Sequence, residues 1–245
     1  RLDLTFYNLR DFLPHTSPPS CLRVLDIGGG TGITALRLAQ LGLQVTLLDS
    51  SLPMLELASR AANEAGVAKK IELKHGDASQ LSNVFPAESF DVILCHNVLE
   101  FVDDPIAVLT SAARAMRNSS AILSILVRNH AGEVLKTAIS GGDLAAAEHT
   151  LAVEWGDESL YGGKVRLFTP DSLHAMLGAA SLTVIAERGV RVVSDYLPPQ
   201  ISRTDEYERI LALELKLGRR PEFAAVARYS HCLTRCSGSS LEVGG

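Results

Sequence analysis

Cysteine and long apolar runs are both scarce in this chain. Its 245 residues include four cysteines, Cys21, Cys95, Cys232 and Cys236, which are too few and too scattered for a disulfide framework. No apolar run approaches the roughly 20 residues that a membrane-spanning helix needs. These absences exclude a disulfide-stapled protein and argue against a membrane partner, so we expect a reducing, cytoplasmic setting.

Net positive charge is absent as well. The 23 Lys and Arg residues are outnumbered by 28 Asp and Glu residues, and the formal net charge is −5. This balance argues against broad coating by nucleic acid, although it leaves room for a local basic groove. Cys232 and Cys236 form a lone C-x-x-x-C pair, for which we expect no metal. No charged-then-apolar signal segment opens the sequence, and because it starts at Arg1 rather than Met we expect further residues upstream.

Short strand patterns alternate with helix patterns through the first half of the chain. Apolar runs at 22–27, 44–48, 70–74, 90–95 and 120–127 predict buried strands, and apolar residues at helical spacing predict helices at 31–41, 51–65 and 105–116. Strands and helices that alternate at this spacing pair in parallel through right-handed crossovers. The pattern predicts an open, doubly wound α/β sheet with its ligand beyond the carboxyl ends of the strands.

The second half has a different character. Residues 129–170 hold helical patches and turn signals but no strong strand, which predicts a helical cap or insertion over the strand ends. Beyond it we expect a short helix at 169–177, strand material in two pieces around Gly189 within 182–193, a charged helix at 203–217 and a last strand at 224–233.

Glycines crowd into the first turn, where residues 24–32 read VLDIGGGTG. A nucleoside triphosphate would need a lysine close behind them, and no basic residue follows until Arg37. A dinucleotide would need a third glycine where Ile33 stands. S-adenosylmethionine remains: its pattern is an acid that closes the strand and then Gly-x-Gly-x-Gly, here Asp26, Gly28, Gly30 and Gly32. With Gly29, these glycines let a methionine tail lie against the backbone.

Acidic residues follow the next strand ends. Asp26 is placed to orient the ammonium group of the cofactor. Asp49, beside Ser50, comes 23 residues later and can accept both ribose hydroxyls. Asp77 can accept the adenine amino group while the Ala78 amide meets the ring. His96 and Asn97 then end the fourth strand on the methionine side of the predicted pocket.

These residues resemble the class I methyltransferase family over about residues 20–128. The resemblance implies a seven-stranded sheet whose last two strands come from the second half. A narrower resemblance links HNVLEFVDDP (96–105), GVRVVSDYL (189–197) and ARYSH (227–231), in this order, to the bacterial tRNA 5-carboxymethoxyuridine methyltransferases. It implies cofactor contacts at Arg1, Gly28, Gly29, Asp49, Asp77, Ala78 and His96, and tRNA modification as the activity. At position 77 that family has a non-acidic residue, whereas this chain has an acid.

The acceptor is left open between tRNA and a small molecule. Residues 131–163 carry one lysine and no arginine against six acids, whereas a surface that follows phosphates needs several basic groups. A carboxylate acceptor is already ionised and needs no general base, so we expect a proximity mechanism without a catalytic residue. Arginine suits a carboxylate, and Arg166, Arg191, Asn97 and Tyr196 are the candidate acceptor residues. A non-catalytic cofactor-binding module is the third interpretation.

The chain then divides as follows. We expect an S-adenosylmethionine-binding core at 1–128, a cap or insertion at 129–170, the C-terminal part of the sheet with its helices at 171–236, and a disordered tail at 237–245.

Overall fold

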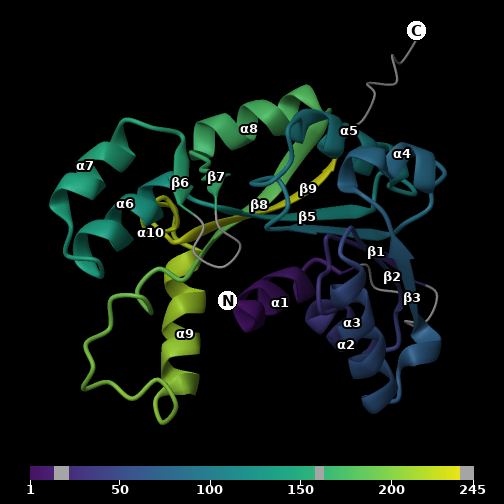
Figure 1. Ribbon diagram of the computed structural model, residues 1–245, viewed down its shortest axis with the longest axis horizontal. Helices are drawn as coiled ribbons and strands as arrows, with labels where there is room; N and C mark the ends of the chain where they lie inside the picture. Colours follow the sequence, from purple (N-terminus) through teal and green to yellow (C-terminus); the bar gives the residue numbers. More distant parts are fainter. Residues whose placement is uncertain (14–21, 158–162, 238–245) are drawn as a thin grey trace, which may run out of the picture.

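A seven-stranded sheet runs through the centre of the molecule (Figure 1). The computed structural model describes residues 1–13, 22–157 and 163–237. Strand order is β3-β2-β1-β4-β5-β9-β8. The strands are β1 (Arg23–Ile27), β2 (Gln44–Asp49), β3 (Ile71–His75), β4 (Val92–His96), β5 (Ile122–Arg128), β8 (Leu182–Val190) and β9 (Tyr229–Cys236). β1 to β5 are parallel to one another, and β9 is antiparallel to both of its neighbours, β5 and β8. The predicted doubly wound, mostly parallel sheet is confirmed.

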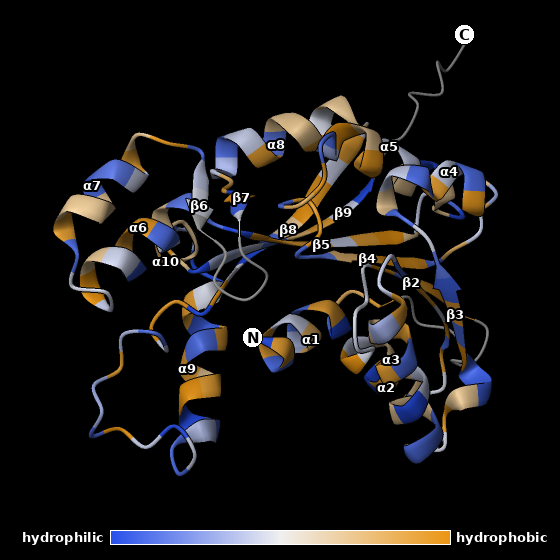
Figure 2. Ribbon diagram, in the orientation of Figure 1, coloured by the Kyte–Doolittle hydropathy of each residue, from blue (hydrophilic) through white to orange (hydrophobic). Residues whose placement is uncertain are grey.

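The central strands are apolar because helices cover both of their faces. Nearly every residue of β1, β4 and β5 is buried, as expected for parallel strands between two helical layers. The edge strand β3 is half-exposed and carries charged residues. Figure 2 shows the same contrast, with β4 and β5 largely orange and β3 largely blue.

Helices form a layer on each side of the sheet (Figure 1). One core cluster joins the sheet to α4, α5 and α8, and a second joins its other face to α1, α2 and α3. The helices of these layers are α1 (Leu2–Arg10), α2 (Ile33–Gln40), α3 (Leu52–Glu64), α4 (Leu81–Val84), α5 (Pro105–Ala115) and α8 (Pro170–Ala179). The remaining helices are α6 (His130–Ile139), α7 (Leu144–Leu151), α9 (Tyr207–Gly218) and α10 (Pro221–Ala224).

Helix starts follow the capping residues in the sequence. Ser51 caps α3, Asp104 caps α5, and Thr169 caps α8 with a reciprocal bond from Ser172. Each cap satisfies a backbone N–H that the first turn leaves without an intrahelical partner. A proline follows each cap in the first turn, where its missing N–H costs nothing.

The region beyond β5 differs in part from expectation. Besides α6 and α7, residues 129–170 contain a hairpin of β6 (Trp155–Asp157) and β7 (Lys164–Arg166). β8 is one strand rather than two pieces, and its irregularity lies between Val184 and Ala186 instead of at Gly189. Gly189 stays within the strand because it allows close packing: a Cβ there would lie 2.8 Å from the Cα of Ala224.

Several predicted boundaries also shift near the C-terminus. α9 begins at Tyr207, four residues later than expected, and β9 begins at Tyr229 because Pro221 starts the short helix α10. Of the predicted disordered tail, residues 238–245 lie outside the described residues. Within the described ranges, no helix combines the length and apolarity needed to cross a membrane.

One edge of the sheet gathers the ends that matter for function. β1 to β5 all end there, β8 ends there at Val190, and β9 starts there at Tyr229, which pairs with both Arg128 and Val190. Loops from both halves of the chain therefore meet at this edge, where an open α/β sheet binds its ligands.

Candidate functional site

The glycine loop follows β1 and takes a backbone path that favours glycine. Gly28, Gly30 and Gly32 have φ values of 64°, 55° and 76°, in the left-handed region. A Cβ on Gly28 would lie 2.6 Å from Val98, and one on Gly29 would lie 2.6 Å from Leu47. A Cβ on Gly30 would meet no heavy atom within 4 Å. Gly28 and Gly29 thus leave room for protein side chains, whereas Gly30 borders open space.

Asp49 ties the glycine loop to the end of β2. Its Oδ2 accepts a hydrogen bond from the Gly30 N–H at 2.8 Å, and its Oδ1 accepts one from the Ser51 N–H at 2.8 Å. The Gly28 N–H also donates to the carbonyl of Leu48 at 2.7 Å. A carboxylate oxygen can accept more than one hydrogen bond, so Asp49 keeps acceptor capacity for a pair of hydroxyls.

Asp26 is a buried acid at the end of β1, with 4% of its surface exposed. Burial, and then the charge of Asp49, raises the pKa of Asp26 to about 7. The ionised form of a carboxyl group in this position is unfavourable unless a cation lies beside it. An ammonium group is such a cation, so the chemistry of this residue fits the predicted methionine end.

Asp77, Ala78 and Ser50 lie toward the β3 side of the same edge. Oδ1 of Asp77 accepts hydrogen bonds from the backbone N–H of Ser79 at 2.8 Å and from its hydroxyl at 2.6 Å, which lowers the pKa of Asp77. Asp77 therefore caps a short 3-10 turn at Ala78–Gln80 and remains exposed. The carbonyl of Ser50 contacts Nε2 of His75 at 3.1 Å.

His96 ends β4 and is half-buried. Its Nε2 lies 2.8 Å from the hydroxyl of Ser124 on the neighbouring β5. Burial, and then the positive charge of Arg1, lowers the pKa of His96 to about 3. His96 is consequently a neutral imidazole throughout the physiological pH range.

Two of the predicted acceptor residues meet an ion-pair cluster where β8 ends. Arg191 has a φ of 62° and pairs with Asp195. Arg228 is 5% exposed and pairs with Glu133 at the start of α6. The Tyr196 hydroxyl lies 3.5 Å from the carbonyl of Gly132, and burial raises its pKa. We call Arg191, Asp195, Tyr196, Arg228 and Glu133 the arginine cluster.

Arg1 stands beside this cluster. Its guanidinium lies 5.5 Å from the centre of the Tyr229 ring, and that of Arg228 lies 5.6 Å from the same centre. Tyr229 begins β9, at the edge where the other strands end. Arg1 is thus placed between His96, whose pKa its charge lowers, and the arginine cluster.

Arg166 and Asn97 are engaged elsewhere. Arg166 lies on β7 with its guanidinium 5.3 Å from the Trp155 ring centre, and no contact among the described residues joins its side chain to the arginine cluster. Asn97, at a φ of 56°, donates from its side-chain amide to Oε1 of Glu100 at 3.0 Å. The backbone N–H of Arg166 donates to the carbonyl of Glu100 at 3.1 Å, so Arg166 and Asn97 both lie next to Glu100. Both residues therefore stay candidates for the acceptor site.

Strand order sets the order of the candidate groups along the edge. From β3 to β2, β1 and β4 come Asp77, Asp49, the glycine loop and His96. An elongated ligand lying along this edge would contact Asp77 at one end and Asp49 in its middle. Its other end would contact the glycine loop and the buried acid Asp26. These groups suit adenine, ribose and a methionine tail in that order.

Comparisons with known proteins agree with this geometry. Residues 25–124 match a methyltransferase domain family. Over 223 residues the chain is 31% identical to the tRNA 5-carboxymethoxyuridine methyltransferase of Escherichia coli, a match that covers 89% of this chain and 81% of that relative. The chain belongs to the class I S-adenosylmethionine-dependent methyltransferase family. It is an enzyme, and its methyl donor is S-adenosylmethionine.

This methyltransferase is also similar to proteins with other names. It is 33% identical over 177 residues to a ubiquinone biosynthesis O-methyltransferase of Idiomarina loihiensis, a match that covers 72% of this chain and 68% of that protein. An S-adenosylmethionine-dependent methyltransferase structure from Mesorhizobium loti superposes with a TM-score of 0.66 at 21% identity and covers 96% of this chain and all of the other. The second likeness concerns the fold alone.

The methyltransferase also has site features that the sequence did not single out. Glu100 is 2% exposed and accepts hydrogen bonds from Asn97 and from the Arg128 N–H at 2.9 Å. Arg228 and Tyr229 lie in the ARYSH segment and Glu100 in HNVLEF, so the resemblance covered them without indicating a role. Their contacts span distant parts of the chain, and no local pattern announces such contacts.

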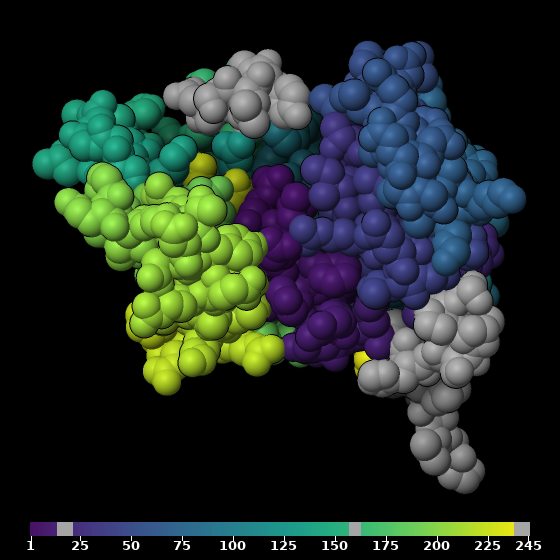
Figure 3. Space-filling model, turned by 90° about the horizontal axis from the view of Figure 1, so that it is seen from below, coloured from purple at the N-terminus to yellow at the C-terminus, as the bar shows by residue number. Residues whose placement is uncertain are grey.

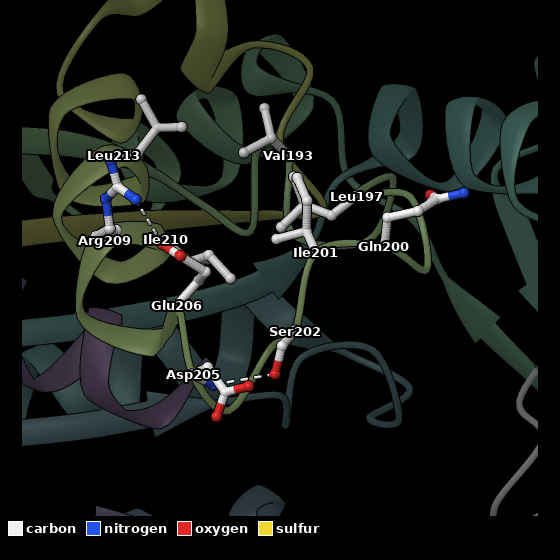
Figure 4. A pocket seen from close by; sticks show the side chains of 10 residues that line it. All are labelled: Val193, Leu197, Gln200, Ile201, Ser202, Asp205, Glu206, Arg209, Ile210 and Leu213. Atoms are coloured by element: carbon white, nitrogen blue, oxygen red, sulfur yellow. Dashed lines mark hydrogen bonds and ion pairs between the residues drawn. The ribbon is translucent and has the colours of Figure 1, made fainter.

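A groove of about 480 Å³ lies beside the arginine cluster, between α9 and the segment that precedes it. Figure 4 shows apolar side chains of Val193, Leu197, Ile201 and Leu213 around it, with an ion pair between Glu206 and Arg209 at its border. None of the predicted cofactor residues lines this groove.

Away from the site, one group of metal-ligand types occurs among the described residues. His174, Glu187 and Cys232 bring their ligating atoms within 4.8 Å of one another, and His174 contacts Glu187 at 3.1 Å. The expectation that the methyltransferase takes no metal therefore stays a prediction. Cys95, Cys232 and Cys236 are free thiols, and Cys95 is buried as expected.

Proposed function

We propose that this methyltransferase esterifies the carboxylate of a modified wobble uridine in tRNA. The observation that carries the proposal is the 31% identity to a tRNA 5-carboxymethoxyuridine methyltransferase along 89% of the chain. That match extends well beyond residues 25–124, which carry the methyltransferase domain. It therefore includes most of the second half, which supplies the arginine cluster.

The cofactor site that we propose uses the edge residues of β1 to β4. Its members are Arg1, Asp26, Gly28, Gly29, Gly30, Gly32, Asp49, Ser50, Asp77, Ala78 and His96. Asp26 would hold the ammonium group, Asp49 the ribose hydroxyls, and Asp77 with the Ala78 amide the adenine. In support, Gly30 borders open space beside Asp49.

For the acceptor we propose Asn97, Arg166, Arg191 and Tyr196. Arg191 is the strongest of them because its guanidinium is partly exposed, with 37% of the side chain accessible, and is paired with one carboxylate. A planar guanidinium presents several N–H donors in a fork that suits a carboxylate. An acceptor carboxylate could share Arg191 with Asp195 and so be held beside Tyr196.

The chemistry needs alignment more than proton transfer. S-adenosylmethionine supplies a methyl group that its sulfonium already activates. The acceptor carboxylate, ionised at neutral pH, forms the new O–C bond in line as the C–S bond breaks, so no proton has to be removed. The protein's task is to hold the reacting atoms about 3 Å apart and exclude water. We assign no general base.

A second candidate function keeps the donor and changes the acceptor to a small molecule. The ubiquinone biosynthesis O-methyltransferases, at 33% identity in one case, favour it. So do the net charge of −5 and the six acids in residues 131–163, because a tRNA surface would need several basic contacts.

The deciding experiment supplies labelled S-adenosylmethionine and compares acceptors. The purified enzyme is incubated with tRNA from cells that lack this methyl ester, with the same tRNA after the ester has formed, and with a small-molecule extract. We expect label only in the first tRNA, in an ester that mild alkali releases. Label confined to the small-molecule extract would replace the tRNA proposal with the second candidate.

A further inference from the structure

A chain of four polar side chains crosses the sheet beneath α1. His96, Ser124 and His231 stand on the neighbouring strands β4, β5 and β9, and Asn8 comes down from α1. Ser124 and His231 are fully buried, and Asn8 is 4% exposed. Burying polar groups costs stability unless they form hydrogen bonds, so a buried row of four polar side chains indicates a role. Of these four residues, only His96 belongs to the proposed cofactor site.

A single hydroxyl bridges the two imidazoles. Oγ of Ser124 lies 2.8 Å from Nε2 of His96 and 2.8 Å from Nε2 of His231. The rings stand edge to face, with centres 5.6 Å apart. At the far end, Nδ1 of His231 lies 3.4 Å from Nδ2 of Asn8.

Both imidazoles are neutral. Burial and then the charge of Arg1 lower the pKa of His96 to about 3, and burial and then His96 lower the pKa of His231 well below its usual value. A neutral imidazole carries one proton, so one ring nitrogen donates and the other accepts. The position of that proton on each ring is therefore set by its neighbours.

The direction of donation along this row of hydrogen bonds follows from Asn8. The Nδ2 of an asparagine only donates, so Nδ1 of His231 accepts and the proton of His231 is on Nε2. That N–H donates to Ser124, whose single hydroxyl proton is then directed to Nε2 of His96. The proton of His96 is consequently on Nδ1, for which no partner occurs among the described residues.

We propose that Asn8, His231 and Ser124 are positioning residues that keep His96 protonated on Nδ1, so that His96 donates a hydrogen bond to an oxygen of bound S-adenosylmethionine. The inference rests on the proposed place of His96 in the cofactor site. A neutral donor suits this place because it meets an oxygen without adding a positive charge near a sulfonium. It also gives α1 a role in cofactor binding besides that of Arg1.

Helix α1 is well fixed for this role. Asp3 pairs with Arg37 of α2 and accepts a hydrogen bond from Tyr207 of α9, and Asp11 pairs with Arg219 at 2.7 Å. In Figure 3, α1 lies between the green-yellow segment that contains α9 and the blue-violet segment of the first half. Arg1 and Asn8 are seven residues apart and so lie on one face of the helix.

The first test reads the protons directly. In enzyme with ¹⁵N-labelled histidine, NMR separates protonated from unprotonated ring nitrogens, and spectra of His96→Gln and His231→Gln assign the two residues. In the free enzyme we expect His96 protonated at Nδ1 and His231 protonated at Nε2. His96 protonated at Nε2 would overturn the proposal, and this measurement on the wild type needs no variant to fold.

The second test compares two variants of similar size at position 231. His231→Gln keeps an N–H donor toward Ser124, whereas His231→Leu removes it. We expect His231→Leu and Ser124→Ala to weaken S-adenosylmethionine binding about fivefold, the equivalent of one neutral hydrogen bond, and His231→Gln to bind close to wild type. His174→Gln, at an exposed histidine on α8, is the control and should not change binding. Equal losses in the Gln and Leu variants would show that position 231 only fills space.

These measurements separate the inference from the acceptor assignment. Both use enzyme without any acceptor, and calorimetry gives the affinity for S-adenosylmethionine alone. If tRNA takes up no label while His96 shows the expected protonation, the tRNA proposal fails and the inference stands. If His96→Gln leaves the affinity for S-adenosylmethionine unchanged, His96 does not contact the cofactor and the inference fails.

Discussion

At the scale of single residues, some groups of the proposed site allow close packing within the protein. Others leave space or hydrogen-bonding capacity for a ligand. Gly28 and Gly29 make room for Val98 and Leu47, whereas Gly30 faces open space. Asp49 holds two backbone N–H groups and keeps acceptor capacity. Single substitutions can separate the two roles because some of these residues have close structural counterparts elsewhere in the chain.

Gly30 and Gly66 form such a matched pair. Both have positive φ, 55° and 69°, and a Cβ on either would meet no atom within 4 Å. Gly30→Val and Gly66→Val should therefore carry similar backbone strain, of about 1–2 kcal/mol. Only Gly30→Val should abolish S-adenosylmethionine binding, measured by calorimetry, because its side chain would fill the open space in which we propose that the cofactor lies. Loss of binding in both variants would point to backbone strain rather than to a blocked cofactor site.

Asp49→Ala should weaken cofactor binding by about 1–3 kcal/mol, because the ribose hydroxyls of the bound cofactor lose their hydrogen-bond acceptor. Glu56→Ala, at an exposed position on the adjacent α3, is the control and should leave the affinity unchanged. Calorimetric titration of both variants checks the difference. An unchanged affinity for Asp49→Ala would remove Asp49 from the cofactor site.

Asp26 should couple cofactor binding to pH. Its pKa is raised to about 7 in the free protein, first by burial and then by Asp49. A bound ammonium group stabilises the anion and so lowers this pKa, which means that the complex holds fewer protons than the free protein. The affinity should then rise with pH up to about 7, with release of a proton. Calorimetry at pH 6 in buffers of different ionisation enthalpy measures that proton, and Asp26→Asn should release none.

At the scale of elements, close contacts of glycine set how α9 and α6 meet the sheet. A Cβ on Gly218 of α9 would lie 2.2 Å from the carbonyl oxygen of Gly189 on β8. One on Gly132 of α6 would lie 2.2 Å from the carbonyl of Ala227. Glu214 of α9 then accepts hydrogen bonds from the backbone of residues 192–194. The segment that carries Arg191 and Asp195 is thus positioned through α9.

Gly218→Ala should destabilise the fold by about 1–3 kcal/mol, the usual cost of overpacking. Gly178→Ala in α8 is the matched control, since its Cβ would meet nothing within 4 Å. That change should stabilise the protein by about 0.5–1 kcal/mol, as alanine does in a helix. Urea denaturation of both variants tests the pair, and equal free energies of unfolding would contradict the close contact at Gly218.

Most elements could be predicted from the sequence, and the misses have physical causes. The strands β1 to β5 follow from apolar periodicity, which is a local signal. The hairpin β6–β7 was missed because its strands of three residues are too short to show apolar alternation. The unbroken β8 was missed because its continuity depends on pairing with the distant strand β9. Gly189 suggested a break in β8, yet the reason for this glycine is the approach of α10.

At the scale of the whole molecule, the continuous sheet joins both halves of the chain. β9 and β8 come from the second half and extend the sheet from β5. The proposed cofactor-binding core and C-terminal part are therefore sequence segments that share a single sheet, whereas the strands of the proposed cap form only the separate hairpin β6–β7. We expect these segments to unfold together.

Cofactor binding should accordingly stabilise the enzyme as one unit. At a hundredfold excess of S-adenosylmethionine over its dissociation constant, the gain is about 2.7 kcal/mol, or roughly 5–10 °C in Tm for a chain of this size. Scanning calorimetry should show one transition that moves as a whole. Two transitions of which only one moves would mean that the halves unfold independently.

The sequence by itself determined the donor and the core of the fold. Acids and glycines at successive strand ends are local patterns, and parallel strands bring their carboxyl ends to one edge, so the candidate cofactor groups could be placed without coordinates. Only the tertiary structure decided what supports them. Asn8 and His231 are 223 positions apart, and Ser124 and His231 are 107 apart. Such contacts arise from strand order and helix packing, for which local periodicity carries no signal.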